Sequence, residues 1–161
     1  MNAKLLGRKN MNKKFKAGII GLGNIGFRYT LDPLRNGISS HVEAYNSHPG
    51  FELIACCDIA PGRLNDVKDY CPDLRFYTSW ENILTKEDLD VLSICVSPGL
   101  NYEVSCSNNF SKLKAVIFEK PFSKDTATGL KIIDNIRDAE IIAAVNHFRR
   151  WQIFFKRSFV K

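Results

Sequence analysis

The chain has 161 residues, a formal net charge of +6 and 45% hydrophobic residues, which is the composition of an ordinary globular domain. This length is enough to bury one hydrophobic core. No apolar run reaches the roughly 18 to 20 residues that a membrane span requires, and the basic N-terminus lacks the apolar segment of a secretory signal. We therefore expect a cytoplasmic protein without a membrane partner.

The positive charge is concentrated at the two ends of the chain. Residues 1–16 contain six Lys or Arg and residues 149–161 contain five, with no acidic residue in either stretch. Residues 17–148 contain 12 basic and 17 acidic residues, a net charge of −5. This distribution is typical of solvated tails rather than of a nucleic-acid-binding groove. We predict no nucleic-acid partner and assign residues 1–14 to a basic tail, in which Met11 is an alternative translation start.

The five cysteines do not form a metal or disulfide pattern. Their number is odd and no two have the CxxC spacing. Cys56, Cys57 and Cys95 lie in apolar runs that resemble strands. We expect small buried thiols in a reducing compartment, and no metal site.

A glycine-rich turn follows the first predicted strand. The apolar run Phe15–Ile20 leads into Gly21-Leu22-Gly23-Asn24-Ile25-Gly26, and a helix is predicted to start at Ile25. In such a dinucleotide fingerprint the first glycine makes the tight turn, the second lets the backbone approach a pyrophosphate, and the third lets helix and strand pack closely. The phosphates would lie on free N–H groups at the helix N-terminus. The predicted cofactor-binding residues here are Gly21, Gly23, Asn24, Ile25 and Gly26.

An insertion interrupts the predicted first helix. Residues 30–37 include Pro33 and Gly37, which break helices, and the helical pattern resumes over residues 40–45 before it stops at His48. Two interpretations remain open for the insertion. It covers the cofactor or the substrate, or it is a surface loop.

The second predicted strand, residues 51–58, ends in an acidic residue. An acid at this position accepts hydrogen bonds from the adenosine ribose hydroxyls and repels a 2′-phosphate, so Asp58 favours NAD. It lies 32 residues after Gly26, beyond the usual spacing of about 20, and the insertion accounts for the excess. Alternatively, Asp58 caps a helix that begins near Pro61. Arg63 is compatible with a 2′-phosphate, so NADP stays open.

The remaining elements alternate between helix and strand, which predicts a doubly wound α/β fold with a parallel sheet between two helical layers. Ligands of such sheets bind at the carboxyl ends of strands, so Ser97 and Pro98 are predicted to border the cofactor. The apolar face of the last helix is assigned to Leu130, Ile132, Ile133 and Ile136. The predicted elements are a helix over 61–70, a strand over 75–77, a capped helical turn over 79–84, a strand over 90–96, a helix over 102–110, a strand over 113–119, a helix over 126–137 and a strand over 140–146.

The fifth strand ends in Glu119-Lys120-Pro121. A lysine at the carboxyl end of a strand, beside a cofactor site, can hydrogen-bond a substrate hydroxyl or take part in proton transfer. Pro121 restricts Lys120 to extended geometry and can form a cis peptide bond. Lys120 is therefore the candidate catalytic residue.

These motifs, in this order, resemble the glucose–fructose oxidoreductase, inositol dehydrogenase and rhizopine-catabolism family of NAD(P)-dependent oxidoreductases. The resemblance covers about residues 15–150. It implies a Rossmann-type fold, contact of Lys120 with the reacting hydroxyl and the nicotinamide region, and a site shaped by Glu119 and Pro121. Asn146, His147 and Arg149 are further candidates at the end of the sixth strand. The chain departs from the family where a His commonly follows the Ser/Thr-Pro, since it has Asn101 or Tyr102 there.

The resemblance also implies a division into domains. Residues 15–148 would be an NAD(P)-binding domain, and residues 149–161 the start of a substrate domain that is otherwise absent from the chain. The complete enzyme would remove hydride from a CH–OH group of a sugar, nucleotide sugar or cyclitol, and this chain alone would bind cofactor but be inactive or nearly so. The aromatic residues 151–160 would dock back or pair with another copy as a homo-oligomer. A non-catalytic dinucleotide-binding module is the alternative.

Overall fold

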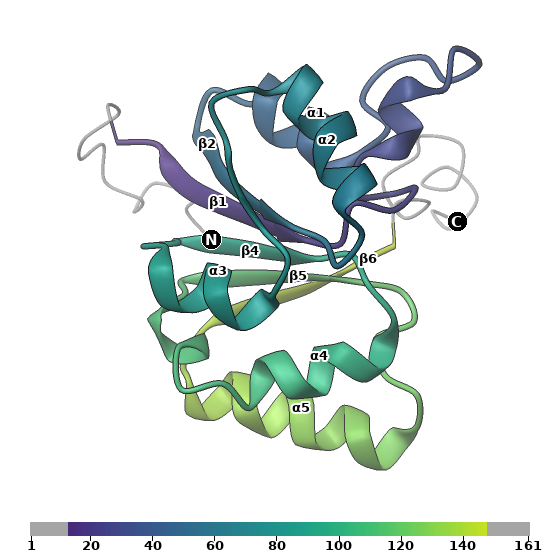
Figure 1. Cartoon of the computed structure of the whole chain (residues 1–161). Coiled ribbons are helices and arrows are strands. Elements are labelled where there is room, and N and C mark those ends of the chain that lie inside the picture. Colours follow the sequence, from purple (N-terminus) through teal and green to yellow (C-terminus); the bar gives the residue numbers. More distant parts are fainter. Residues whose placement is uncertain (1–12, 148–161) are drawn as a thin grey trace, which may run out of the picture.

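The computed structural model describes residues 13–147, which form a single six-stranded sheet between two layers of helices (Figure 1). All pairs of neighbouring strands are parallel, in the order β3-β2-β1-β4-β5-β6. This order reverses direction between β1 and β4, so the predicted doubly wound fold is confirmed. The strands are β1 (Phe15–Ile20), β2 (Phe51–Cys57), β3 (Arg75–Tyr77), β4 (Val91–Ile94), β5 (Ala115–Glu119) and β6 (Ile142–Asn146).

The helices are divided between the two faces of the sheet. In Figure 1, α1 and α2 lie on one face, and α3, α4 and α5 lie on the other. In the described residues, no helix is both long and apolar enough to cross a membrane. The helices are α1 (His41–Ser47), α2 (Pro61–Tyr70), α3 (Trp80–Lys86), α4 (Pro98–Ser105) and α5 (Thr126–Asp138), with short 3-10 helices η1 (Arg28–Leu31) and η2 (Phe110–Lys112).

Two hydrophobic clusters, one on each face, hold the helices to the sheet. Successive side chains of a strand point to opposite faces, so β1 contributes Ala17 and Ile19 to one cluster and Ile20 to the other. Cys56 and Cys57 on β2 are buried as predicted and divide between the clusters in the same way. The central strands are therefore buried on both faces, as their apolar sequences predict.

The prediction of a helix from Ile25 is wrong. The residues after the glycine turn form an irregular turn in which the amides of Phe27 and Arg28 both donate to the carbonyl of Gly23. The α-helix begins only at His41, where the Ser40 hydroxyl accepts the Glu43 amide as an N-cap. The amides of His41 and Val42 then donate to the carbonyls of Ile25 and Gly26, at 3.0 and 3.1 Å. Thus the first amides of α1 bond to carbonyls of the glycine turn across the insertion.

Two further predictions need correction. The helix predicted over 102–110 begins at Pro98 and ends at Ser105, because proline is well suited to the first helical position. On α5, Leu130 and Ile133 are 57% and 41% exposed. The core side of α5 is formed by Gly129, Ile132 and Ile136, which have helical spacing. The predicted tail at 1–14 is largely, and the predicted domain start at 149–161 wholly, outside the described residues.

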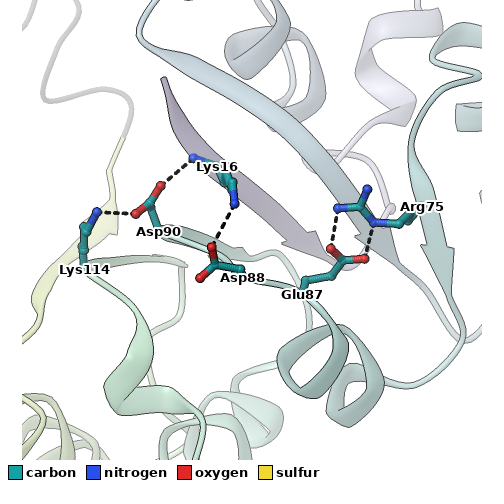
Figure 2. A network of polar contacts seen from close by, with 6 residues as sticks. All are labelled: Lys16, Arg75, Glu87, Asp88, Asp90 and Lys114. Carbon is teal, nitrogen blue, oxygen red and sulfur yellow. Dashed lines mark hydrogen bonds and ion pairs between the residues drawn. The ribbon is translucent and has the colours of Figure 1, made fainter. Parts of the chain in front are cut away.

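A group of ion pairs stabilises the end of the sheet at which the strands begin (Figure 2). The carboxylate of Glu87 is 4% exposed and accepts two hydrogen bonds from the Arg75 guanidinium and one of 2.6 Å from the Tyr77 hydroxyl. Burial raises the pKa of Glu87, but the bonds from Arg75 and Tyr77 outweigh it, so this pKa lies below its ordinary value. The pair holds β3 to the turn after α3.

Asp90 joins three strands at the same end. Its carboxylate accepts the backbone amide of Lys16 at 2.9 Å and pairs with the ammonium of Lys114. Lys16 in turn pairs with Asp88 at 2.8 Å, as Figure 2 shows. Burial raises the pKa of Asp90, but the bonds from Lys114 and Lys16 lower it further than burial raises it. This carboxylate therefore links the starts of β1, β4 and β5.

We expect Glu87→Gln to lower the free energy of unfolding by about 1 to 3 kcal/mol at neutral pH, because the Arg75 charge loses its buried partner. The folded-state pKa of Glu87 is depressed, so its stabilisation is present above the ordinary value of 4.5 and is lost as the pH falls through the folded-state value. The difference between wild type and variant in urea unfolding should therefore vanish in acid. Asp134→Asn, which breaks the exposed Arg137 pair, is the control and should change little.

Candidate functional site

The first and third glycines of the turn are required by close backbone packing. Gly21 has a φ of 95°, and a Cβ there would lie 2.5 Å from the carbonyl oxygen of Cys95. A Cβ at Gly26 would lie 2.0 Å from the carbonyl oxygen of Gly21. Both residues are buried and are absent from the lining of the cavity described next. They shape the turn, as the fingerprint predicts.

The second glycine faces open space. A Cβ at Gly23 would meet no atom within 4 Å. Gly23, Asn24 and Ile25 line a cavity of about 1190 Å³ at the carboxyl ends of the strands. In the described part of the chain, the backbone amides from Gly23 to Gly26 have no acceptor. Adjacent free amides around an open glycine form the kind of concave site that binds phosphate.

Asp58 follows β2 and fixes the glycine turn. Its carboxylate is 4% exposed and accepts the Leu22 amide at 2.8 Å, the Ala60 amide at 2.9 Å and the Arg63 guanidinium at 3.3 Å. A carboxylate has roughly four acceptor positions, so about one remains for a ligand hydroxyl. Asp58 itself is not among the residues that line the cavity. The alternative role as the cap of α2 does not match the geometry, since Ala60 is the N-cap and has no side-chain cap bond.

The ends of β4, β5 and β6 supply the rest of the cavity. Cys95, Val96, Glu119, Lys120 and Asn146 line it. Lys120 is exposed, and its peptide bond to Pro121 is cis.

Other predicted residues lie beside the cavity rather than on its wall. Ser97 is the N-cap of α4 and Pro98 is its first residue. Neither these two nor Pro121 lines the cavity. His147 is exposed at the last described position, and Arg149 is outside the described residues.

The insertion lines the same cavity. Arg35, within residues 30–37, and the flanking residues Tyr29 and Ile38 are on its wall, although Ile38 remains largely exposed. The Arg35 guanidinium lies 3.4 Å above the ring of Tyr29 and pairs with Asp32. The insertion therefore borders the site, in line with the first of its two interpretations, and also has the exposed apolar side chains of a surface loop.

A buried chain of polar groups leads to Glu119, and sequence analysis did not identify most of its members. His41 Nε2 lies 3.0 Å from Glu119 Oε1, and His41 Nδ1 lies 3.0 Å from Ser93 Oγ. The Tyr45 hydroxyl is 2.7 Å from Ser93 Oγ, and the Asn146 amide donates to Glu119 Oε1. The sequence contains one sign of this buried polar network, because Ser93 is the only polar residue of β4.

Hydrogen bonding keeps the Glu119 carboxylate ionised. Burial raises the pKa of Glu119, but the bonds from His41 and Asn146 outweigh it, so the net pKa is lowered. Burial also raises the pKa of Tyr45 to about 12, so its hydroxyl stays protonated at neutral pH. The site therefore contains a buried anion next to the exposed Lys120.

Asn101 occupies the region in which members of the resembling family commonly have a His. Its amide donates to the carbonyl of Phe122 at 2.8 Å, and its own oxygen is buried without a partner among the described residues. Asn101 therefore supports the backbone that follows the cis Lys120–Pro121 bond. Among the residues that the structure covers, no cluster of His, Cys, Asp or Glu is suited to a metal ion.

Comparison with known proteins places the chain beside dehydrogenases. A model of the oxidoreductase family with an NAD-binding Rossmann fold matches residues 15–147. Inositol 2-dehydrogenase of Salmonella typhimurium is 29% identical over 120 residues, which is 74% of this chain and 32% of that protein. Myo-inositol 2-dehydrogenase of Thermotoga maritima is 25% identical over 142 residues, 88% of this chain and 39% of that protein. The chain thus spans 32% to 39% of the length of these curated relatives.

Solved structures share the fold. Scyllo-inositol dehydrogenase from Lactobacillus casei, with bound cofactor NAD(H) and scyllo-inositol, superposes with a TM-score of 0.74 at 18% identity, over 91% of this chain and 40% of that one. The WlbA dehydrogenase from Chromobacterium violaceum, in complex with NADH and UDP-GlcNAcA, gives a TM-score of 0.66 at 22% identity, over 85% of this chain and 36% of that one.

The contrast between the glycines is testable. We expect Gly23→Ala to leave the free energy of unfolding unchanged or raise it by about 0.4 to 1 kcal/mol, because the methyl group meets no protein atom. It should weaken NADH binding at least about tenfold, equivalent to about 1.4 kcal/mol. Fluorescence titration measures the affinity. Gly62→Ala on α2, also in open space, should not change it, and Gly26→Ala should prevent folding.

Proposed function

We propose, from the premise that the chain belongs to the oxidoreductase family with an NAD-binding Rossmann fold, that it forms the cofactor-binding part of an NAD-dependent dehydrogenase of polyols or sugars. One observation carries the proposal. The same cavity is lined by the open backbone of the glycine turn and by Lys120. The presence of a lysine there favours an enzyme over a non-catalytic dinucleotide-binding module.

The environment of Asp58 supports NAD over NADP as the cofactor. A buried carboxylate at the end of β2 would repel a 2′-phosphate and has an acceptor position left for a ribose hydroxyl. Arg63, the residue that would favour NADP, is already paired with Asp58 at 3.3 Å.

The residues of this chain suggest which group takes the hydride and which takes the proton. NAD, when bound, accepts a hydride from the carbon that bears the hydroxyl group. The hydroxyl proton is then lost, and Lys120 Nζ, exposed on the cavity wall, can hydrogen-bond that oxygen and receive the proton when the amine is neutral. Glu119 is buried and bonded to His41 and Asn146, so we assign it to holding the strand end rather than to proton transfer.

The names of the relatives support the substrate class. Two are inositol dehydrogenases, and one structural neighbour contains scyllo-inositol. A cyclitol presents several secondary hydroxyls, which suits hydride transfer assisted by a lysine. A cytoplasmic location and assembly into a homo-oligomer stay predictions from the sequence.

The preference for NADH is tested by titrating the chain with NADH and NADPH in parallel. We expect wild type to bind NADH more tightly, and Asp58→Asn to reduce the ratio of the two affinities by about tenfold, because the repulsion of the 2′-phosphate is lost. Asp66→Asn, an exposed charge on α2, is the matched control. Equal affinity of wild type for both cofactors would contradict the role of Asp58.

The role of Lys120 is tested by turnover of the complete protein with myo-inositol and scyllo-inositol. We expect Lys120→Ala to lower kcat at least about a hundredfold, within the usual range for a lost general acid–base group. The dissociation constant for NADH should change little. Lys131→Ala, which removes an exposed lysine from α5, should have wild-type kinetics. A normal kcat for Lys120→Ala would refute the assignment.

A further inference from the structure

When the His41 imidazole is neutral, the hydrogen bonds of the buried polar chain all run in one direction. An ionised carboxylate only accepts hydrogen bonds, so His41 Nε2 must carry the proton that it shares with Glu119 Oε1. In a neutral imidazole, Nδ1 then accepts the Ser93 hydroxyl, and Ser93 Oγ accepts the Tyr45 hydroxyl. Every donor points towards Glu119, an arrangement in which successive bonds strengthen one another.

Glu119 is bound on both of its oxygens. Oε1 accepts from His41 and from the Asn146 amide. Oε2 faces the backbone amide of Lys120 at 3.4 Å. The carboxylate is 7% exposed, so water cannot easily replace a lost donor. The position of Glu119 therefore fixes the start of the segment that carries Lys120.

His41 also contacts the phosphate-binding side of the cavity. Its backbone amide donates to the carbonyl of Ile25 at 3.0 Å, and Ile25 lies in the glycine turn. Its side chain, on the same residue, reaches Glu119. No other pair of hydrogen bonds in the described residues joins the glycine turn to the Glu119-Lys120 segment through one residue.

We propose that His41 is a positioning residue, which holds Lys120 in register with the cofactor by joining the glycine turn to Glu119. This inference rests on the proposed function. A misplacement of a catalytic group by about 1 Å can lower the rate by about a hundredfold, so loss of the His41 contact should affect turnover more than cofactor binding.

Two substitutions distinguish the contact made by His41 Nδ1 from the contact made by His41 Nε2. Asparagine places its amide near the position of Nδ1, so His41→Asn retains a partner for Ser93 and loses Glu119. Glutamine reaches farther, to the position of Nε2, so His41→Gln retains a donor to Glu119. Val42→Ala truncates the neighbouring buried side chain on α1 and is the control for loss of stability alone.

In the complete protein, with NAD and myo-inositol, we expect His41→Asn to lower kcat by at least about tenfold. The dissociation constant for NADH should stay within about threefold of wild type. His41→Gln should recover most of kcat. Val42→Ala should lower the melting temperature without changing kcat per folded molecule. An unchanged kcat in His41→Asn, or an equal loss in both His41 variants, would overturn the proposal.

A second readout does not depend on catalysis. The exchange rate of the Lys120 backbone amide, followed by NMR in the 161-residue chain, should rise in His41→Asn and stay near wild type in His41→Gln and in Val42→Ala. If wild type neither binds NADH nor turns over, the proposed function fails, and this exchange pattern still decides whether His41 positions Lys120. The same exchange rate in both His41 variants would refute that coupling.

Discussion

The contact between Gly21 and the end of β4 is the constraint on which the site depends. The Gly21 amide donates to Cys57 on β2, and the Cys95 amide donates to Ile20 on β1. These bonds bring three strand ends together where the strand order reverses, and only glycine fits the remaining space. From this point the chain leaves β1 towards one face and β4 towards the other. The cavity opens between them, so its position follows from the topology before any side chain is considered.

Two buried carboxylates hold segments that line this cavity. Asp58 holds the glycine turn through Leu22, and Glu119 holds the segment that carries Lys120. A buried carboxylate is costly unless N–H donors surround it, so each one constrains the backbone and side chains that supply those donors. Burial of charge, which contributes little net stability by itself, here fixes the relative positions of the two segments that line the cavity.

Local patterns were sufficient to predict the sheet and the tight glycine turn, and to locate Asp58 and Lys120 at the ends of strands, because each depends on neighbours in sequence. The roles of these two side chains towards a ligand stay predictions. Local patterns failed where the outcome depends on distant residues. His41 lies 52 residues from Ser93 and 78 from Glu119, and no spacing rule connects residues so far apart. The exposed Leu130 was assigned to the core because helical periodicity identifies an apolar stripe without saying which part of it the sheet covers.

The insertion shows how the cavity can change while the fold does not. The chain leaves the glycine turn at Gly26 and returns to it at His41, where the amides of His41 and Val42 donate to the carbonyls of Ile25 and Gly26. The entropic cost of closing a loop rises only slowly with its length, so such an excursion costs little once its ends are fixed. Arg35 of the insertion and the adjoining Tyr29 are nevertheless added to the cavity wall. Since Arg35 is already stacked on Tyr29 and paired with Asp32, the insertion contributes a preformed wall rather than a free positive charge.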